Sequence, residues 1–235
     1  MKNFFKKVIS GNETPEGKTA MLREKWQKHE LVAQWQKNGW LDEEPADVMA
    51  YLLGEWERRN EPVPPVHKVK VNTISEFAKE YKYDTLIETG TYLGTMIDAQ
   101  KGNFKKIISI EVDPGFHNNA KENFKAFPHI EFLLGDSGKL MAGLMPSIAE
   151  PAIFWLDAHY NNRSSVKLDK ECPIYEELDA IFDSRPLDHI LLIDDARLFI
   201  GKNDYPTIPE LTAYIQRKRP DYRVEIKNDI IRAMK

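Results

Sequence analysis

The sequence predicts an α/β fold with a doubly wound, mostly parallel sheet and helices on both of its faces. Two observations support this prediction. From about residue 67 onward, continuous apolar runs such as AIFWL and HILLI alternate with segments of helical periodicity, a pattern typical of a parallel sheet covered by helices. Acidic residues also follow one expected strand after another, at the end of the sheet where such folds bind their ligands.

The elements are expected to follow one another regularly, each helix leading into a strand. A terminal hairpin, turning at Asn228-Asp229, should complete the sheet. The expected helices cover residues 73–81, 95–101, 114–127, 138–148, 173–182 and 208–217, and the expected strands cover 85–88, 106–111, 130–134, 152–157, 189–194 and the hairpin 222–233.

Residues 1–66 should form a helical extension before the main domain, which spans residues 67–235. Helices are expected over 19–37 and 44–59, and the stiff run PVPPV ends this part of the chain. Two roles stay open for the extension: a layer packed on the main domain, or a lid or homo-oligomer contact. It carries four of the five tryptophans, Trp26, Trp35, Trp40 and Trp56.

Composition limits the class of protein. The net charge of −4 gives no reason to expect a nucleic-acid partner. No run of 18 apolar residues is present, so no membrane span is expected. The single cysteine, Cys172, excludes an intrachain disulfide and fits a reducing compartment. A cytoplasmic location is therefore the expectation.

The glycine-rich turn LIETGTYLGT differs from a dinucleotide fingerprint. Three residues separate Gly90 from Gly94, and the acid Glu88 comes just before them. A pyrophosphate cradle needs closer glycines and favours a helix N-terminus without an acid. This turn therefore favours a cofactor with a cationic or hydroxyl-rich part. Glu111 ends the next strand, a place where an acid commonly holds ribose hydroxyls, whereas Asp136 could equally cap the following helix.

Three further acids are expected to meet at neighbouring strands. Asp157 ends one strand, and Asp194 and Asp195 end the next. Oxygen ligands of this kind suit Mg²⁺, Mn²⁺ or Ca²⁺ rather than zinc. The alternative stays open that one of them caps a helix and another pairs with Arg197 or Arg163.

The segments LIETGTYLGT, ISIEVD, FLLGDS, FWLDAHY and LLIDDAR, in this order, resemble the class I S-adenosylmethionine-dependent methyltransferases. More narrowly, residues 70–235 resemble the metal-dependent sugar O-methyltransferases of the macrocin and mycinamicin type. The resemblance implies a Rossmann-like, seven-stranded sheet whose last strand is antiparallel. It also implies cofactor contacts from the methionine end to the adenine end of the molecule, through Glu88, Gly90, Thr91, Tyr92, Gly94 and Thr95, then Glu111, then Asp136 with Ser137.

The expected activity is methyl transfer to a hydroxyl of a sugar, a nucleotide-linked sugar or another small polyhydroxylated acceptor. A divalent ion lowers the pKa of such a hydroxyl and orients it, and a base removes its proton. His159, two residues after Asp157, is the candidate base, although a structural or metal-contacting role stays open. The alternatives are a phenolic, phosphorylated or nitrogen acceptor, or a non-catalytic cofactor-binding module.

Overall fold

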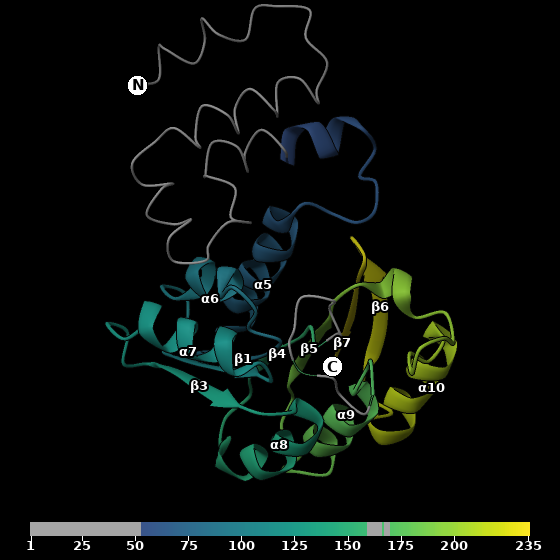
Figure 1. Cartoon of the computed structure of the whole chain (residues 1–235). Helices are drawn as coiled ribbons and strands as arrows, with labels where there is room; N and C mark the ends of the chain where they lie inside the picture. Colours follow the sequence, from purple (N-terminus) through teal and green to yellow (C-terminus); the bar gives the residue numbers. More distant parts are fainter. Residues whose placement is uncertain (1–52, 159–165, 167–169) are drawn as a thin grey trace, which may run out of the picture. The chain divides into compact units, whose positions relative to one another are not determined.

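The computed structural model describes residues 53–158, 166 and 170–235 (Figure 1). Contacts divide the chain into two units, Met1–Asn60 and Glu61–Lys235. The helix expected over 19–37 lies outside the described residues, as does most of the one expected over 44–59, of which residues 53–58 are helical. None of the helices in the described ranges is long and apolar enough to cross a membrane.

The described part of Glu61–Lys235 contains a seven-stranded sheet in the order β3-β2-β1-β4-β5-β7-β6. The first five strands are parallel, and β7 runs antiparallel to both of its neighbours. The predicted Rossmann-like, mostly parallel sheet is confirmed. The strands are β1 Thr85–Thr89, β2 Lys106–Glu111, β3 Ile130–Leu134, β4 Ile153–Leu156, β5 Ile190–Ile193, β6 Arg223–Lys227 and β7 Ile230–Met234.

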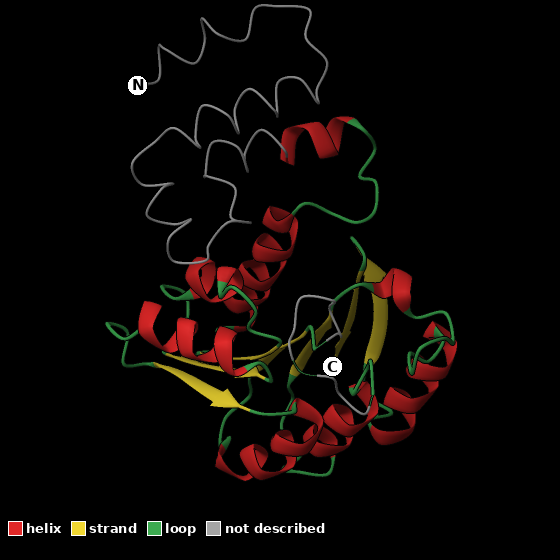
Figure 2. Ribbon diagram, viewed as in Figure 1, coloured by secondary structure: helices red, strands yellow, loops and turns green. Residues whose placement is uncertain are grey.

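Helices cover both faces of this sheet (Figure 2). The helices α5 to α7 lie on one face and α8 to α10 on the other (Figure 1). The central strands are buried from both sides, which explains their continuous apolar sequences. The helices are α5 His67–Tyr81, α6 Thr95–Gln100, α7 Pro114–Asn123, α8 Ser137–Leu144, α9 Ile174–Phe182 and α10 Ile208–Lys218, with short 3₁₀ helices η1 Met145–Ser147 and η2 Ala196–Leu198.

Three helix ends differ from the sequence prediction by four or more residues. The helix α5 begins at His67, directly after the extended Val66, and not at residue 73. The helix α7 ends at Asn123, four residues before the predicted 127. The helix α8 gives way to a 3₁₀ turn at Pro146, which has no N–H to continue the α-helical hydrogen bonds. The early start of α5 matters most, because it brings Lys70 into this helix and to the carboxyl ends of the parallel strands.

Candidate functional site

A cavity of about 350 Å³ lies at the carboxyl ends of the parallel strands, a size typical of small-molecule sites. It forms there because the strands β1 to β5 are parallel, so the loops that follow them all open at this edge. Its wall includes the following residues predicted from the sequence: Gly90, Tyr92, Glu111, Asp136, Ser137, Asp157, Asp194 and Asp195.

The turn after β1 is built around Gly90. Its backbone has φ +85°, and a Cβ atom there would lie only 2.4 Å from the carbonyl oxygen of Asp157. Only glycine lets the ends of β1 and β4 come this close. The Gly90 N–H also donates to the carbonyl of Ile110 at 2.9 Å. The turn is thereby tied to the ends of both neighbouring strands.

Glu111, the last residue of β2, is held by backbone donors. Its Oε2 accepts from the N–H of Tyr92 at 2.7 Å, and its Oε1 accepts from the N–H of Asp113 at 2.8 Å. Burial raises the pKa of this carboxyl, and the two backbone hydrogen bonds oppose that rise. Since a carboxylate has about four acceptor positions, Glu111 can also accept a pair of hydroxyls from the cavity.

Asp136 caps a helix and lines the cavity. Its side chain accepts from the N–H of Gly138 at 3.0 Å as the N-cap of α8, and it pairs with Lys139 at 3.2 Å. Ser137, the first residue of α8, lies beside it in the cavity wall. The alternative interpretation of Asp136 as a helix cap is therefore correct, and it is compatible with a ligand contact.

Other residues predicted for the cofactor lie outside the cavity wall. Glu88 is buried, and its carboxyl accepts a hydrogen bond from the hydroxyl of Ser109, which is also bonded to the Thr91 hydroxyl. Burial raises the pKa of Glu88 well above its usual range, which favours the protonated acid. Gly94 begins α6 with φ +78° and Thr95 follows it. A cofactor contact by Glu88, Thr91, Gly94 and Thr95 remains a prediction.

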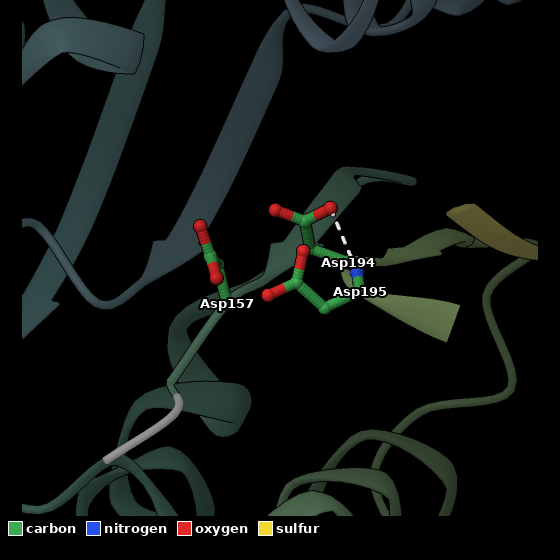
Figure 3. Close-up of side chains that lie close together, drawn as sticks. All are labelled: Asp157, Asp194 and Asp195. Carbon is green, nitrogen blue, oxygen red and sulfur yellow. Dashed lines mark hydrogen bonds between the residues drawn. The ribbon is translucent and has the colours of Figure 1, made fainter. Parts of the chain in front are cut away.

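Three carboxylates converge at the ends of β4 and β5 (Figure 3). One ligand atom from each of Asp157, Asp194 and Asp195 lies within 4.8 Å of the others. The backbone N–H of Asp195 donates to Asp194 Oδ1 at 2.8 Å. Burial first, and then the nearby Asp157 charge, raise the pKa of Asp194, whereas the ammonium of Lys70 opposes this rise. We refer to these three residues as the carboxylate cluster; its oxygen-only donors fit a hard divalent cation.

Lys70 is a member of this site that the sequence analysis missed. Its ammonium donates to Asp194 Oδ2 and lies 3.4 Å from Asp195 Oδ1, and it lines the cavity. Burial lowers the pKa of Lys70, but the neighbouring carboxylates, Asp194 foremost, raise it above the usual value. The signal was available: a helix that leads into β1 begins near the carboxyl ends of the parallel strands. The predicted start at residue 73 left Lys70 outside that helix.

The other predicted basic partners are engaged or lie outside the described residues. Arg197 pairs with Asp195 Oδ1 at 2.7 Å and also with Asp229, so its predicted pairing with the cluster is correct. The candidate general base His159 lies outside the described residues, as does Arg163. The role of His159 as the base that removes the hydroxyl proton stays a prediction.

The chain shares its fold with solved methyltransferase structures. No protein-family model and no curated protein sequence matches it. SAH-bound PaMTH1 from Podospora anserina is 15% identical, with 96% of this chain and 98% of that chain covered and a TM-score of 0.53. TomG from Streptomyces achromogenes, an O-methyltransferase of tomaymycin synthesis in complex with SAM, is 16% identical (82% and 90% covered, TM-score 0.52). A Bacillus cereus O-methyltransferase in complex with SAH is 14% identical (86% and 97%, TM-score 0.51). At these identities the likeness establishes the fold.

Proposed function

We propose that the protein is an S-adenosylmethionine-dependent O-methyltransferase that uses a divalent cation to methylate a hydroxyl of a small polyhydroxylated acceptor, such as a sugar. The observation that carries the proposal is that the wall of one cavity contains both Glu111 and the carboxylate cluster. A ribose-binding acid and a cation site at one strand edge are the two parts that such a reaction needs.

The cofactor is assigned to the Glu111 side of the cavity. The Glu111 carboxylate is oriented by two backbone N–H groups and can accept both ribose hydroxyls. Asp136 and Ser137 stand at the next strand end, where the adenine would follow. The SAM and SAH complexes of the structural neighbours support this choice of cofactor.

Asp157, Asp194 and Asp195 would hold the cation, with Mg²⁺ as the first candidate and Mn²⁺ or Ca²⁺ as alternatives. When bound, the ion supplies Lewis acidity that makes an acceptor hydroxyl easier to deprotonate. In the proposed reaction the acceptor oxygen attacks the methyl carbon, the carbon–sulfur bond breaks, and the hydroxyl proton passes to a base. His159 is proposed as that base.

A phenolic acceptor is the second candidate for the substrate. The same cavity wall that contains the carboxylate cluster also contains the apolar groups of Val166, Leu198 and Tyr205. An aromatic ring would pack on such a surface. Comparing sugars and vicinal diphenols as acceptors distinguishes the two candidates.

The experiment for the proposed function separates cofactor, cation and acceptor. Calorimetry with SAH should show binding, and mass spectrometry should show methyl transfer that EDTA abolishes and Mg²⁺ restores. The variant Asp194→Asn should lower transfer at least about 100-fold, whereas Asp183→Asn, on the exposed end of α9, should not. An absence of SAH binding contradicts the cofactor assignment. Full methyl transfer in the presence of EDTA contradicts the role of the cation but leaves the cofactor assignment standing.

For residues 1–66 we propose a role as a lid over the acceptor or as a homo-oligomer contact. Among the described residues, those that line the cavity all come from Lys70 onward. A chain beginning at Glu61 should therefore retain SAH binding and lose either acceptor affinity or its oligomeric state. If the shortened chain matches the full chain in both properties, this role is excluded.

A further inference from the structure

Lys70 contacts the carboxylate cluster and lines the cavity. A positive charge of the chain itself therefore lies where a metal ion is proposed. It is the fourth residue of α5, and its ammonium donates to Asp194 Oδ2. The other oxygen of Asp194, Oδ1, accepts the backbone N–H of Asp195 at 2.8 Å. Each oxygen of the Asp194 carboxylate therefore already has a donor.

The charges in the cluster show what this contact does. The side chain of Asp194 is 1% exposed, and an ionised carboxylate so far from water needs a nearby positive charge. Arg197 contacts Asp195 and is shared with Asp229, away from Asp194. In the described part of the chain, Lys70 is the basic residue that contacts Asp194.

We propose that Lys70 is an internal counter-ion of the carboxylate cluster, and that its ammonium and a divalent cation occupy the cluster alternately. This inference rests on the divalent cation of the proposed function and adds how its site is regulated. An ion bound to Asp194 through Oδ2 would share this oxygen with the ammonium of Lys70. Two positive charges on one buried oxygen repel each other strongly, because little water screens them.

The exchange has two consequences for the protein. With Lys70 in place, part of the negative charge of the cluster is neutralised, so its carboxylates repel one another less before the ion arrives. An entering ion must displace this ammonium, so the affinity of the site for the ion is lower than its three carboxylates alone would provide. The site then binds its cation reversibly, and Lys70 sets the affinity.

The test measures Mn²⁺ binding to the full-length protein without cofactor or acceptor, from the electron paramagnetic resonance signal of free Mn²⁺. The variant Lys70→Met removes the charge and keeps an unbranched side chain of similar length. We expect it to bind Mn²⁺ more tightly than the unmodified protein by about tenfold or more. The matched control Lys79→Met removes one exposed charge from the other end of the same helix and should leave the affinity unchanged.

Equal or weaker Mn²⁺ binding by Lys70→Met overturns the inference and leaves the proposed cation site standing. If neither protein binds Mn²⁺, the inference and the cation both fall, while SAH calorimetry still decides the cofactor. If Lys70→Met does not fold, acylation of lysines in the unmodified protein provides the test. Because the ion displaces the Lys70 ammonium from Asp194, Mn²⁺ should speed the acylation of Lys70 relative to that of Lys79. A labelling ratio that Mn²⁺ does not change overturns the proposal.

Discussion

Replacing Gly90 with alanine tests how the turn after β1 positions the site. The new Cβ atom would lie 2.4 Å from the Asp157 carbonyl oxygen, and the two atoms must separate by about 1 Å to reach ordinary contact at 3.4 Å. The φ of +85° adds about 1–2 kcal/mol for a residue other than glycine. Moving the backbone at the end of β4 adds a further cost of about 1–3 kcal/mol. We therefore expect Gly90→Ala to lower the free energy of unfolding by about 2–5 kcal/mol.

Thermal unfolding followed by circular dichroism measures this loss. For a chain of this size, a loss of about 2–5 kcal/mol corresponds to an expected fall in Tm of about 4–20 °C. The control is Gly143→Ala on the exposed face of α8, where a Cβ meets nothing within 4 Å. Alanine in that helix should raise the stability by up to about 1 kcal/mol. The two substitutions thus have opposite expected signs.

The same substitution should also disturb the reaction. Because Gly90 contacts the backbone of Asp157, a shift of about 1 Å there displaces one carboxylate of the cluster and lowers turnover about 100-fold. If the free energy of unfolding of Gly90→Ala lies within about 0.5 kcal/mol of that of the unmodified protein, the proposed steric role of this glycine is wrong.

Three more predictions concern single side chains. Glu111→Gln places an amide NH₂ against one of the two backbone N–H donors and should weaken SAH binding by calorimetry about tenfold or more, whereas Glu131→Gln on the exposed side of β3 should not; equal losses contradict a specific role. His189 is buried and its Nδ1 accepts the Ala152 N–H, and burial lowers its pKa from 6.5 to about 4. The unfolded chain therefore binds a proton at His189 more readily than the folded chain. The contribution of His189 to the free energy of unfolding is complete above pH 6.5 and falls by up to about 3 kcal/mol as the pH drops to 4. Urea unfolding of His189→Gln should therefore depend less on pH, and an unchanged pH dependence refutes this role of His189. Cys172 is buried with its pKa raised to about 12, so a maleimide should label it only after unfolding; rapid labelling of the folded protein contradicts this.

The strands were predictable because their signal is local. An apolar run flanked by polar residues identifies a buried strand without reference to the rest of the chain. The bounds of β2 and β3 agree with the sequence prediction, and the Asn228-Asp229 turn has φ values of 56° and 61°, as such hairpins require. Helix ends were less predictable, since α5 begins where the chain leaves the extended Val66 and not where apolar periodicity becomes clear.

Part of the site was also predictable. Acids at the ends of parallel strands come to one edge of the sheet, so the meeting of Asp157 with Asp194 and Asp195 followed from the strand order. The direction of each side chain did not follow. Glu88 and Glu111 both lie near the ends of adjacent strands, yet Glu88 bonds Ser109 inside the sheet while Glu111 lines the cavity.

The sequence by itself determined the order of strands and helices and the acidic residues at the strand ends, because periodicity and turn residues are properties of neighbours along the chain. Only the tertiary structure decided that Lys70 meets Asp194, 124 positions away, and that Gly90 lies against Asp157. Such contacts depend on where a helix begins and how closely two strands pack. Those quantities arise from the packing of the whole domain, and no short segment of sequence contains them.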